Sequence, residues 1–294
     1  MFLYFFWMVV QYVHMILYYS DNPCLFKTEY EYSLGTLRER ATIYSSFPPK
    51  PKIMLFLSGS YNLTFDVYIK KMIRDIQSSG QFADYQMLVY EKTDKSSIIV
   101  YRDVAHYIKH LEGPMSELVI VGFSSGGVVA SHVMSSLSDL VGLKKTIVTY
   151  DTPYQVHDNV LRFQQNWLYR IDIPFFWIVL DVYRRHYNYD EISPIIHRVL
   201  GQKNLWTCGA DTMIELICAI HQFTKEEMLR VTGFCHVPDC TVVNIYCEKD
   251  PFVNRETDIL VPNLITIKKP VMGHCSDMSF SRGQICLDDC GKNN

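Results

Sequence analysis

The sequence predicts an α/β fold with a mostly parallel central sheet and helices on both faces. Short apolar segments rich in β-favouring residues alternate along the chain with segments of helical period. This alternation implies right-handed crossovers between parallel strands that are covered on either side by helices. The 294 residues, 48% of them hydrophobic, are enough for one large buried core, so we expect one main domain that carries an insertion.

The first predicted elements are an antiparallel hairpin and a buried strand. Residues 26–33 and 40–46 alternate between apolar and polar side chains on either side of a Leu-Gly turn signal, which is typical of a hairpin. A proline-containing link leads to residues 53–57, a continuous apolar run of the kind found in strands buried on both faces. Helical period follows over residues 64–77.

The same alternation continues through the rest of the chain. Short apolar runs predict further strands at residues 86–90, 118–121, 145–150, 241–247 and 264–267. Helical period predicts two helices between them, at residues 97–111 and 125–137.

The alternation is interrupted between residues 151 and 240. This stretch contains an aromatic segment at residues 173–180, and it separates two predicted strands of the same sheet. Long excursions of this kind are usually functional insertions. We interpret residues 151–240 as a cap or lid inserted into a domain that spans residues 21–294.

A G-x-S-x-G motif stands between a predicted strand and a predicted helix, with Ser124 at its centre. A sharp turn that exposes this serine requires Gly122 and Gly126, because glycine lets the strand and the helix pass closely. The amide of Ser125 would lie at a helix N-terminus, where the helix dipole favours negative charge. The motif alone is weakly specific, but its position between a strand and a helix makes it a strong signal.

On this motif, and on the residues that follow it, the chain resembles the α/β-hydrolase superfamily in its lipase and esterase branch, over about residues 26–294. Members place a nucleophile after the fifth strand, an acid after a late strand and a histidine after the last strand. The resemblance therefore implies the α/β-hydrolase fold and a catalytic triad of Ser124, Asp250 and His274.

The candidate acid follows the predicted strand at residues 241–247. Members of the superfamily commonly place the acid in a turn such as Glu-Lys-Asp-Pro, and here Asp250 matches better than Glu248. It would accept a hydrogen bond from the imidazole, fix its tautomer and stabilise the imidazolium. Two alternatives stay open: Asp250 only caps an Asp-Pro turn, or Asp151, directly after the preceding strand, is the acid.

The candidate base, His274, follows the last predicted strand and would take the proton of Ser124 and return it to the leaving group. The third predicted strand ends in Ser-Gly-Ser at residues 58–60, where many members carry His-Gly and a small residue. This alignment makes the amide of Ser60 the second oxyanion donor, beside that of Ser125. Ser58 stands in place of the usual histidine. The alternative for His274 is a surface or packing residue, and the alternative for residues 58–60 is an ordinary Ser-Gly turn.

The resemblance implies a serine hydrolase that cleaves a carboxylic ester through an acyl-enzyme and needs neither a metal nor an organic cofactor. The apolar, aromatic insertion favours a lipid-like or acyl substrate. An acyltransferase with the same triad and a non-enzymatic binding module of the same fold are the alternatives. The formal net charge of -3, without any run of Lys and Arg, disfavours nucleic acid as a partner.

Residues 1–20 form a separate hydrophobic segment. Residues 1–19 contain no Asp, Glu, Lys or Arg, and their length is close to the roughly 20 residues that a membrane-spanning helix needs. Nothing in the segment matches the basic start and small-residue end of a cleaved signal. We expect a membrane anchor; the alternative is an aromatic-rich segment packed on the domain.

Nine cysteines leave two further alternatives open. Cys235 with Cys240, and Cys286 with Cys290, would form disulfides in an oxidising compartment and would stay thiols in a reducing one. The same four cysteines with His236 suggest a zinc site, but paired C-x-x-C spacing is absent, which disfavours zinc.

Overall fold

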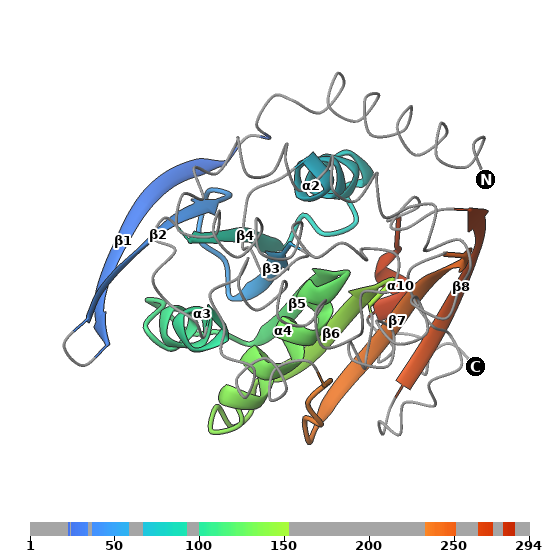
Figure 1. Cartoon of the computed structure of the whole chain (residues 1–294). Helices are drawn as coiled ribbons and strands as arrows, with labels where there is room; N and C mark the ends of the chain where they lie inside the picture. Colours follow the sequence, from blue (N-terminus) through green and yellow to red (C-terminus); the bar gives the residue numbers. More distant parts are fainter. Residues whose placement is uncertain are drawn as a thin grey trace, which may run out of the picture. The chain divides into compact units, whose positions relative to one another are not determined.

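The computed structural model describes Pro23 and residues 25–34, 37–58, 67–92, 100–152, 233–250, 264–272 and 279–285. In this part of the chain, eight strands form one sheet in the order β1-β2-β4-β3-β5-β6-β7-β8 (Figure 1). Each strand predicted from the sequence is present. Their bounds are β1 (Phe26–Leu34), β2 (Leu37–Ser45), β3 (Lys52–Leu57), β4 (Tyr85–Lys92), β5 (Glu117–Phe123), β6 (Lys144–Tyr150), β7 (Cys240–Lys249) and β8 (Leu264–Met272).

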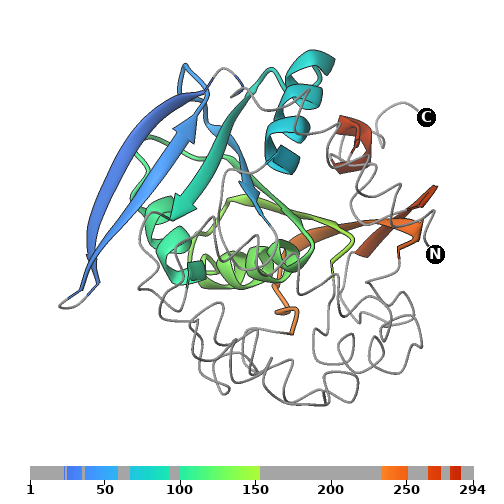
Figure 2. The ribbon, with the colours of Figure 1, turned by 45° about the horizontal axis from the view of Figure 1, so that its top comes forward.

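Helices cover both faces of this sheet, as predicted. Their bounds are α2 (Val67–Ser79), α3 (Val100–Lys109), α4 (Ser125–Ser136) and α10 (Arg282–Ile285). Figure 2 shows α2 and α10 on one face and α3 and α4 on the other. The predicted α/β class with a mostly parallel sheet is therefore confirmed.

The buried face of α2 explains why this segment is a helix. Its four buried apolar residues recur at spacings of three and four, which places them on one stripe: Ile69, Met72, Ile73 and Ile76. They share a core cluster with alternate strand residues, such as Phe56 of β3 and Val121 of β5. The intervening strand residues point to the opposite face. Every residue of β5 is consequently buried.

The parallel register places the carboxyl ends of the central strands at one edge. β2 is antiparallel to both β1 and β4, whereas the strands from β4 through β8 run parallel to one another. The ladder between β5 and β6 ends at Phe123 and Tyr150, and the ladder between β6 and β7 ends at Tyr150 and Ile245. Ligands of open parallel sheets bind beyond such carboxyl ends.

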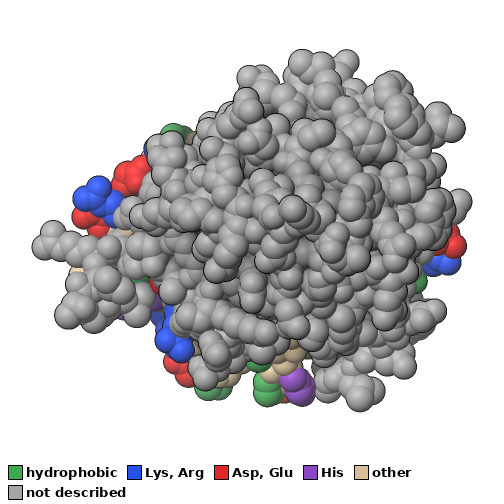
Figure 3. All heavy atoms as spheres, in the orientation of Figure 1, with side chains coloured by type: hydrophobic (Ala, Val, Ile, Leu, Met, Phe, Trp, Pro, Cys, Tyr) green, Lys and Arg blue, Asp and Glu red, His purple; other side chains and the backbone are tan. Residues whose placement is uncertain are grey.

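The edge hairpin carries charged side chains that protect it from pairing with another chain. Basic and acidic side chains lie side by side on the visible rim of the described part (Figure 3). On β1 and β2, Lys27 Nζ lies 3.1 Å from Glu29 Oε1, and Arg40 Nε lies 3.0 Å from Glu31 Oε1. Exposed pairs of this kind contribute little to stability. Their charge nevertheless disfavours edge-to-edge association of β1.

The chain divides into two compact units. One consists of Met1–Pro153, Phe234–Val253 and Asp258–Asn294 and contains the sheet, and the other consists of Tyr154–Gly233 and Asn254–Thr257. The predicted cap at residues 151–240 and the hydrophobic segment at residues 1–20 fall almost wholly outside the described residues and stay predictions. Among the described helices, none is both long and apolar enough to cross a bilayer.

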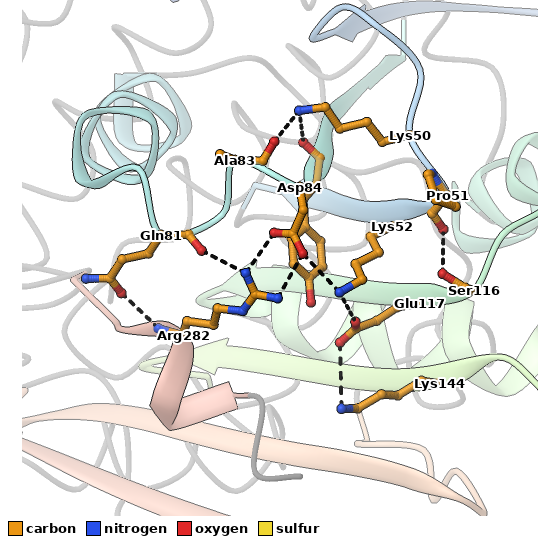
Figure 4. A network of polar contacts seen from close by, with 11 residues as sticks. Lys50, Pro51, Lys52, Gln81, Ala83, Asp84, Ser116, Glu117, Lys144 and Arg282 are labelled. Atoms are coloured by element: carbon orange, nitrogen blue, oxygen red, sulfur yellow. Dashed lines mark hydrogen bonds and ion pairs between the residues drawn. The ribbon is translucent and has the colours of Figure 1, made fainter. Parts of the chain in front are cut away.

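A polar network joins the C-terminal helix α10 to the start of β4 (Figure 4). Arg282 Nη1 and Nη2 donate to Asp84 Oδ1 and Oδ2 at 2.9 and 2.8 Å. Lys52 Nζ also donates to Asp84, at 2.9 Å. The Arg282 guanidinium and the Lys52 ammonium both lie over the ring of Tyr85. Two parallel hydrogen bonds fix the orientation of the guanidinium relative to the carboxylate as well as their distance. The pair therefore orients α10 against the sheet.

This network makes stability depend on pH in a defined direction. Burial alone would raise the pKa of Asp84, but hydrogen bonds from Lys52 and Arg282 outweigh burial and hold that pKa below its ordinary value. The stabilisation is therefore complete above the unfolded-state pKa and is lost as the pH falls through the lower folded-state pKa.

We expect Arg282→Met to lower the free energy of unfolding by about 1 kcal/mol or less near neutral pH, because water screens this partly exposed pair. The difference from the parent should shrink at about pH 3, below the ordinary pKa of an aspartate, because the unfolded chain takes up a proton there that the lowered pKa of Asp84 opposes in the folded state. Urea unfolding at both pH values measures it, with Asp84→Asn as the matched partner variant. A difference that stays the same at both pH values would show that the ion pair is not its source.

Candidate active site

The backbone of Ser124 is held in a strained conformation between β5 and α4. Its φ is 51° and its ψ is -135°, and positive φ is uncommon in residues other than glycine. Two backbone hydrogen bonds hold the turn: Ser124 N–H donates to Tyr150 O at 2.8 Å, and Gly127 N–H donates to Ser124 O at 3.1 Å. The Ser124 side chain is partly exposed at the carboxyl edge of the sheet.

The two motif glycines lie where the backbone passes too closely for any side chain. A Cβ atom on Gly122 would lie 2.4 Å from the carbonyl oxygen of Gly126. A Cβ atom on Gly126 would lie 2.4 Å from the carbonyl oxygen of Ser58, at the end of β3. Both obstacles are backbone atoms, which cannot move aside. The strand, the helix and the end of β3 therefore meet at the Ser124 turn.

A third glycine is needed at this turn, and it was not predicted from the sequence. A Cβ atom on Gly127 would lie 2.1 Å from Thr152 Oγ1 and 2.8 Å from Thr152 Cγ2. Thr152 is buried, so its side chain has little room to move away. The sequence does contain a second glycine directly after Gly126. The reason why Gly127 must be glycine is its contact with Thr152, which lies far from it in the sequence.

The candidate oxyanion donors come from two neighbouring elements. Ser125 is the first residue of α4, so its N–H belongs to the unpaired amides at the helix N-terminus. Ser58, which stands where many α/β-hydrolases have histidine, is buried against the start of α4. Ser60 lies outside the described residues. The end of β3, two residues before Ser60, thus lies against the turn that carries Ser125.

The candidate acid lies at the same edge of the sheet as Ser124. Asp250 directly follows β7, is 9% exposed, and donates its backbone N–H to Cys247 O at 3.2 Å. Because β5, β6 and β7 are adjacent and parallel, Asp250 and Ser124 lie at the same edge, two strands apart. His274 falls outside the described residues, two positions after the end of β8, which pairs parallel with β7.

The alternative acid, Asp151, lies between these two positions. It directly follows β6 and is 1% exposed, with a φ of 41°. Its carboxylate Oδ1 accepts a hydrogen bond from Cys247 N–H at 2.6 Å. Asp151 is thus bonded to the same strand end that carries Asp250.

The three cysteines in the described part of the chain belong to no metal site there. Cys235, Cys240 and Cys247 are free thiols. Burial raises the pKa of Cys240 to about 12, which opposes the thiolate form that zinc requires. In the described part of the chain, no three His, Cys, Asp or Glu side chains gather as a metal site. Cys286 and Cys290 lie outside that part.

Comparison with known proteins identifies the fold. No protein-family model and no curated protein matches the chain. Among solved structures, a proposed hydrolase of Agrobacterium vitis S4 has a TM-score of 0.51 at 11% identity, with 86% of this chain and 92% of that chain covered. Alpha/beta hydrolase domain-containing protein 10 from mouse has a TM-score of 0.47 at 12% identity, with 84% and 90% covered.

A third solved structure, AbyA5, is longer than this chain. It has a TM-score of 0.48 at 11% identity, and the match covers 85% of this chain but only 65% of AbyA5. Such identities bear on the fold alone. The match to the Agrobacterium vitis S4 structure, together with the strand order, shows that the chain has the α/β-hydrolase fold.

The close packing at Gly127 can be tested by a compensating substitution. We expect Gly127→Ala to lower the free energy of unfolding by about 1–3 kcal/mol, because the new methyl group overpacks against Thr152. Adding Thr152→Ala removes the two nearest atoms and should restore part of the loss. Thermal unfolding of the single and double variants measures this coupling.

Gly126→Ala is the matched control for that experiment. Its obstacle is the backbone carbonyl of Ser58, so Thr152→Ala should not restore its stability. If Thr152→Ala improves both alanine variants equally, the contact assigned to Gly127 is wrong.

Proposed function

We propose that this protein of the α/β-hydrolase fold is a serine hydrolase that cleaves a carboxylic ester of a lipid-like or acyl compound. The observation that carries the proposal is the strained, partly exposed Ser124 at the end of β5, directly before α4. A structure retains strain of this kind only where its surroundings over-determine the geometry, and such positions cluster at functional sites. The buried carboxylate of Asp250 at the same edge supports the assignment.

The proposed mechanism has two steps that share one oxyanion site. Ser124 Oγ attacks the ester carbonyl carbon while His274 takes its proton, and the amides of Ser60 and Ser125 bind the oxyanion. The tetrahedral intermediate collapses, and the alcohol leaves with the proton from His274. Water then attacks the acyl-enzyme by the same route and releases the acid. Asp250 orients the imidazole and stabilises its cationic form.

We expect Ser124→Ala to abolish labelling by a fluorophosphonate probe and to lower kcat on p-nitrophenyl esters by about a thousandfold or more, because the nucleophile is lost. His274→Gln and Asp250→Asn should also lower kcat. The chain-length series of esters separates short-chain esterase from lipase activity.

The control for this experiment is the fold of the variant. Circular dichroism and the melting temperature of Ser124→Ala should match the parent, since alanine keeps the Cβ atom at this backbone position and only one oxygen is removed. Full ester turnover by a well-folded Ser124→Ala protein would exclude the proposed nucleophile. Labelling of Ser124 with no hydrolysis of any ester would favour an acyltransferase instead.

We also propose that residues 1–19 attach the protein to a membrane. Besides their apolar composition, an exposed aromatic pair supports this attachment. Phe26 is 64% exposed and Phe47 is 73% exposed, and their rings meet edge to face with centroids 5.9 Å apart. Phe26 begins β1, only a few residues after the apolar run. Exposed aromatic rings beside an apolar segment suit a surface that meets lipid.

Deletion of residues 1–20 should move the protein from the membrane pellet to the soluble fraction while kcat on a soluble ester stays within about twofold, because these residues include none of the proposed site residues. Phe26→Ser with Phe47→Ser should weaken the binding of the full chain to phosphatidylcholine vesicles. Val141→Ser is the matched control, because Val141 is also a highly exposed apolar residue but lies between α4 and β6. Unchanged partitioning after the deletion would exclude the anchor.

A further inference from the structure

We infer that Asp151 is a positioning residue: its carboxylate holds the end of β7 on which Asp250 stands. This inference rests on the proposed function, because it assigns to Asp250 the role of triad acid. It also separates the two carboxylates that the sequence left as competing candidates. Asp151 and Asp250 follow adjacent parallel strands, and both are buried.

The Asp151 carboxylate takes the place of a backbone carbonyl in the sheet. Asp151 N–H donates to Ile245 O at 3.0 Å, as the next residue of β6 would in a parallel ladder. In that ladder, the carbonyl of the same residue accepts from the residue two positions further along β7, which is Cys247. Here Asp151 Oδ1 accepts that N–H instead, at 2.6 Å. The side chain therefore extends the β6–β7 ladder by one hydrogen bond after the backbone has turned away.

The backbone turn at Asp151 explains why a side chain is needed. The φ of Asp151 is 41°, outside the range of a strand, and β6 ends one residue earlier, at Tyr150. Without the carboxylate, the buried N–H of Cys247 would lose this acceptor. An unsatisfied buried amide is costly, and a carboxylate is a strong acceptor in a buried setting.

A single residue links this bond to Asp250. Cys247 accepts the N–H of Asp250 on its carbonyl, at 3.2 Å, while its own N–H is held by Asp151. The pairing of β7 with β8 shifts register between Cys247 and Lys249, so the strand end is irregular on that side. The bond from Asp151 therefore fixes β7 from the β6 side where its other ladder is interrupted.

The same short segment also holds the candidate nucleophile. Tyr150, the residue before Asp151, accepts the N–H of Ser124 at 2.8 Å. Residues 150 and 151 thus bond to the Ser124 turn on one side and to the strand end before Asp250 on the other. Asp151 accordingly sets the position of the acid relative to the nucleophile.

A positioning role and an acid role predict different outcomes for a neutral substitution. A triad acid needs its charge to stabilise the imidazolium, whereas holding Cys247 N–H needs only an oxygen acceptor. Asparagine keeps an Oδ1 at the same place, and alanine removes it. Asp151→Asn and Asp151→Ala therefore separate the two roles, with Asp250→Asn as the matched variant of the neighbouring carboxylate.

The test uses the full chain and p-nitrophenyl esters. Asp151→Ala should lower kcat by about 10- to 100-fold with KM changed by less than about threefold, because the acid is misplaced but substrate binding is not affected. Asp151→Asn should stay within about threefold of the parent, while Asp250→Asn loses most of its activity. The acid limb of the kcat/KM pH profile should move to lower pH in Asp151→Ala, as in Asp250→Asn, because the imidazolium loses support.

Two outcomes would overturn the inference. If Asp151→Asn is inactive and Asp250→Asn is active, Asp151 is itself the acid. If Asp151→Ala lowers the melting temperature but leaves the acid limb and kcat unchanged, the residue serves stability alone. Should the alanine variant not fold, the comparison of the two asparagine variants still decides between the roles.

Hydrogen exchange tests the link without any turnover. The amides of Cys247 and Asp250 should exchange faster in Asp151→Ala than in the parent, and at nearly the parent rate in Asp151→Asn. Unchanged exchange in the alanine variant would overturn the inference. A parent protein that neither reacts with fluorophosphonate nor cleaves esters would instead refute the proposed function, while the exchange rates would still report on the bond to β7.

Discussion

The hydrogen bond between Ser124 N–H and Tyr150 O, 2.8 Å long, joins a strained residue to the sheet that strains it. A non-glycine residue at positive φ costs of order 1–3 kcal/mol and persists only where other contacts oppose its relaxation. Here the opposing contacts are the ladder from β5 to β6 and the close passage of α4 over Gly122. The geometry at Ser124 is therefore a property of the whole central sheet.

The same dependence explains which residues surround the turn. Backbone from the end of β3 lies where a side chain of Gly126 would be, and Thr152 lies where a side chain of Gly127 would be. The ends of β3, β5 and β6 consequently meet the start of α4 with very little space between them. Such packing leaves little freedom to move, which suits a site that must hold donors in place before a reaction starts.

The order and type of the elements could be predicted because their signals are local. Apolar runs and helical period depend on neighbours within one segment, and each predicted strand is present. β8 was predicted to end at residue 267 but continues through Pro270 to Met272. Proline is tolerated there because β8 is the last described strand of the sheet, and among the described strands it pairs only with β7.

The parts that could not be predicted depend on contacts between distant residues. Gly127 is required by Thr152, and the role of Asp151 depends on Cys247, which is 96 positions away. Asp151 and Asp250 both follow predicted strands of one sheet, so from the sequence they were alternative candidates for one role. Only the structure shows that the carboxylate of Asp151 accepts the N–H of Cys247, three residues before Asp250.

Energetics support function rather than stability as the reason for a carboxylate at position 151. Removing a carboxylate from water costs several kcal/mol, whereas a hydrogen bond to a charged group contributes only about 1.5–3 kcal/mol. One further residue of regular β6 would satisfy Cys247 N–H with a backbone carbonyl and avoid that cost. The chain instead turns away at Asp151, and Thr152 then packs against Gly127 beside the Ser124 turn. The carboxylate lets β6 end early enough to shape that turn while β7 stays hydrogen-bonded on the β6 side as far as Cys247.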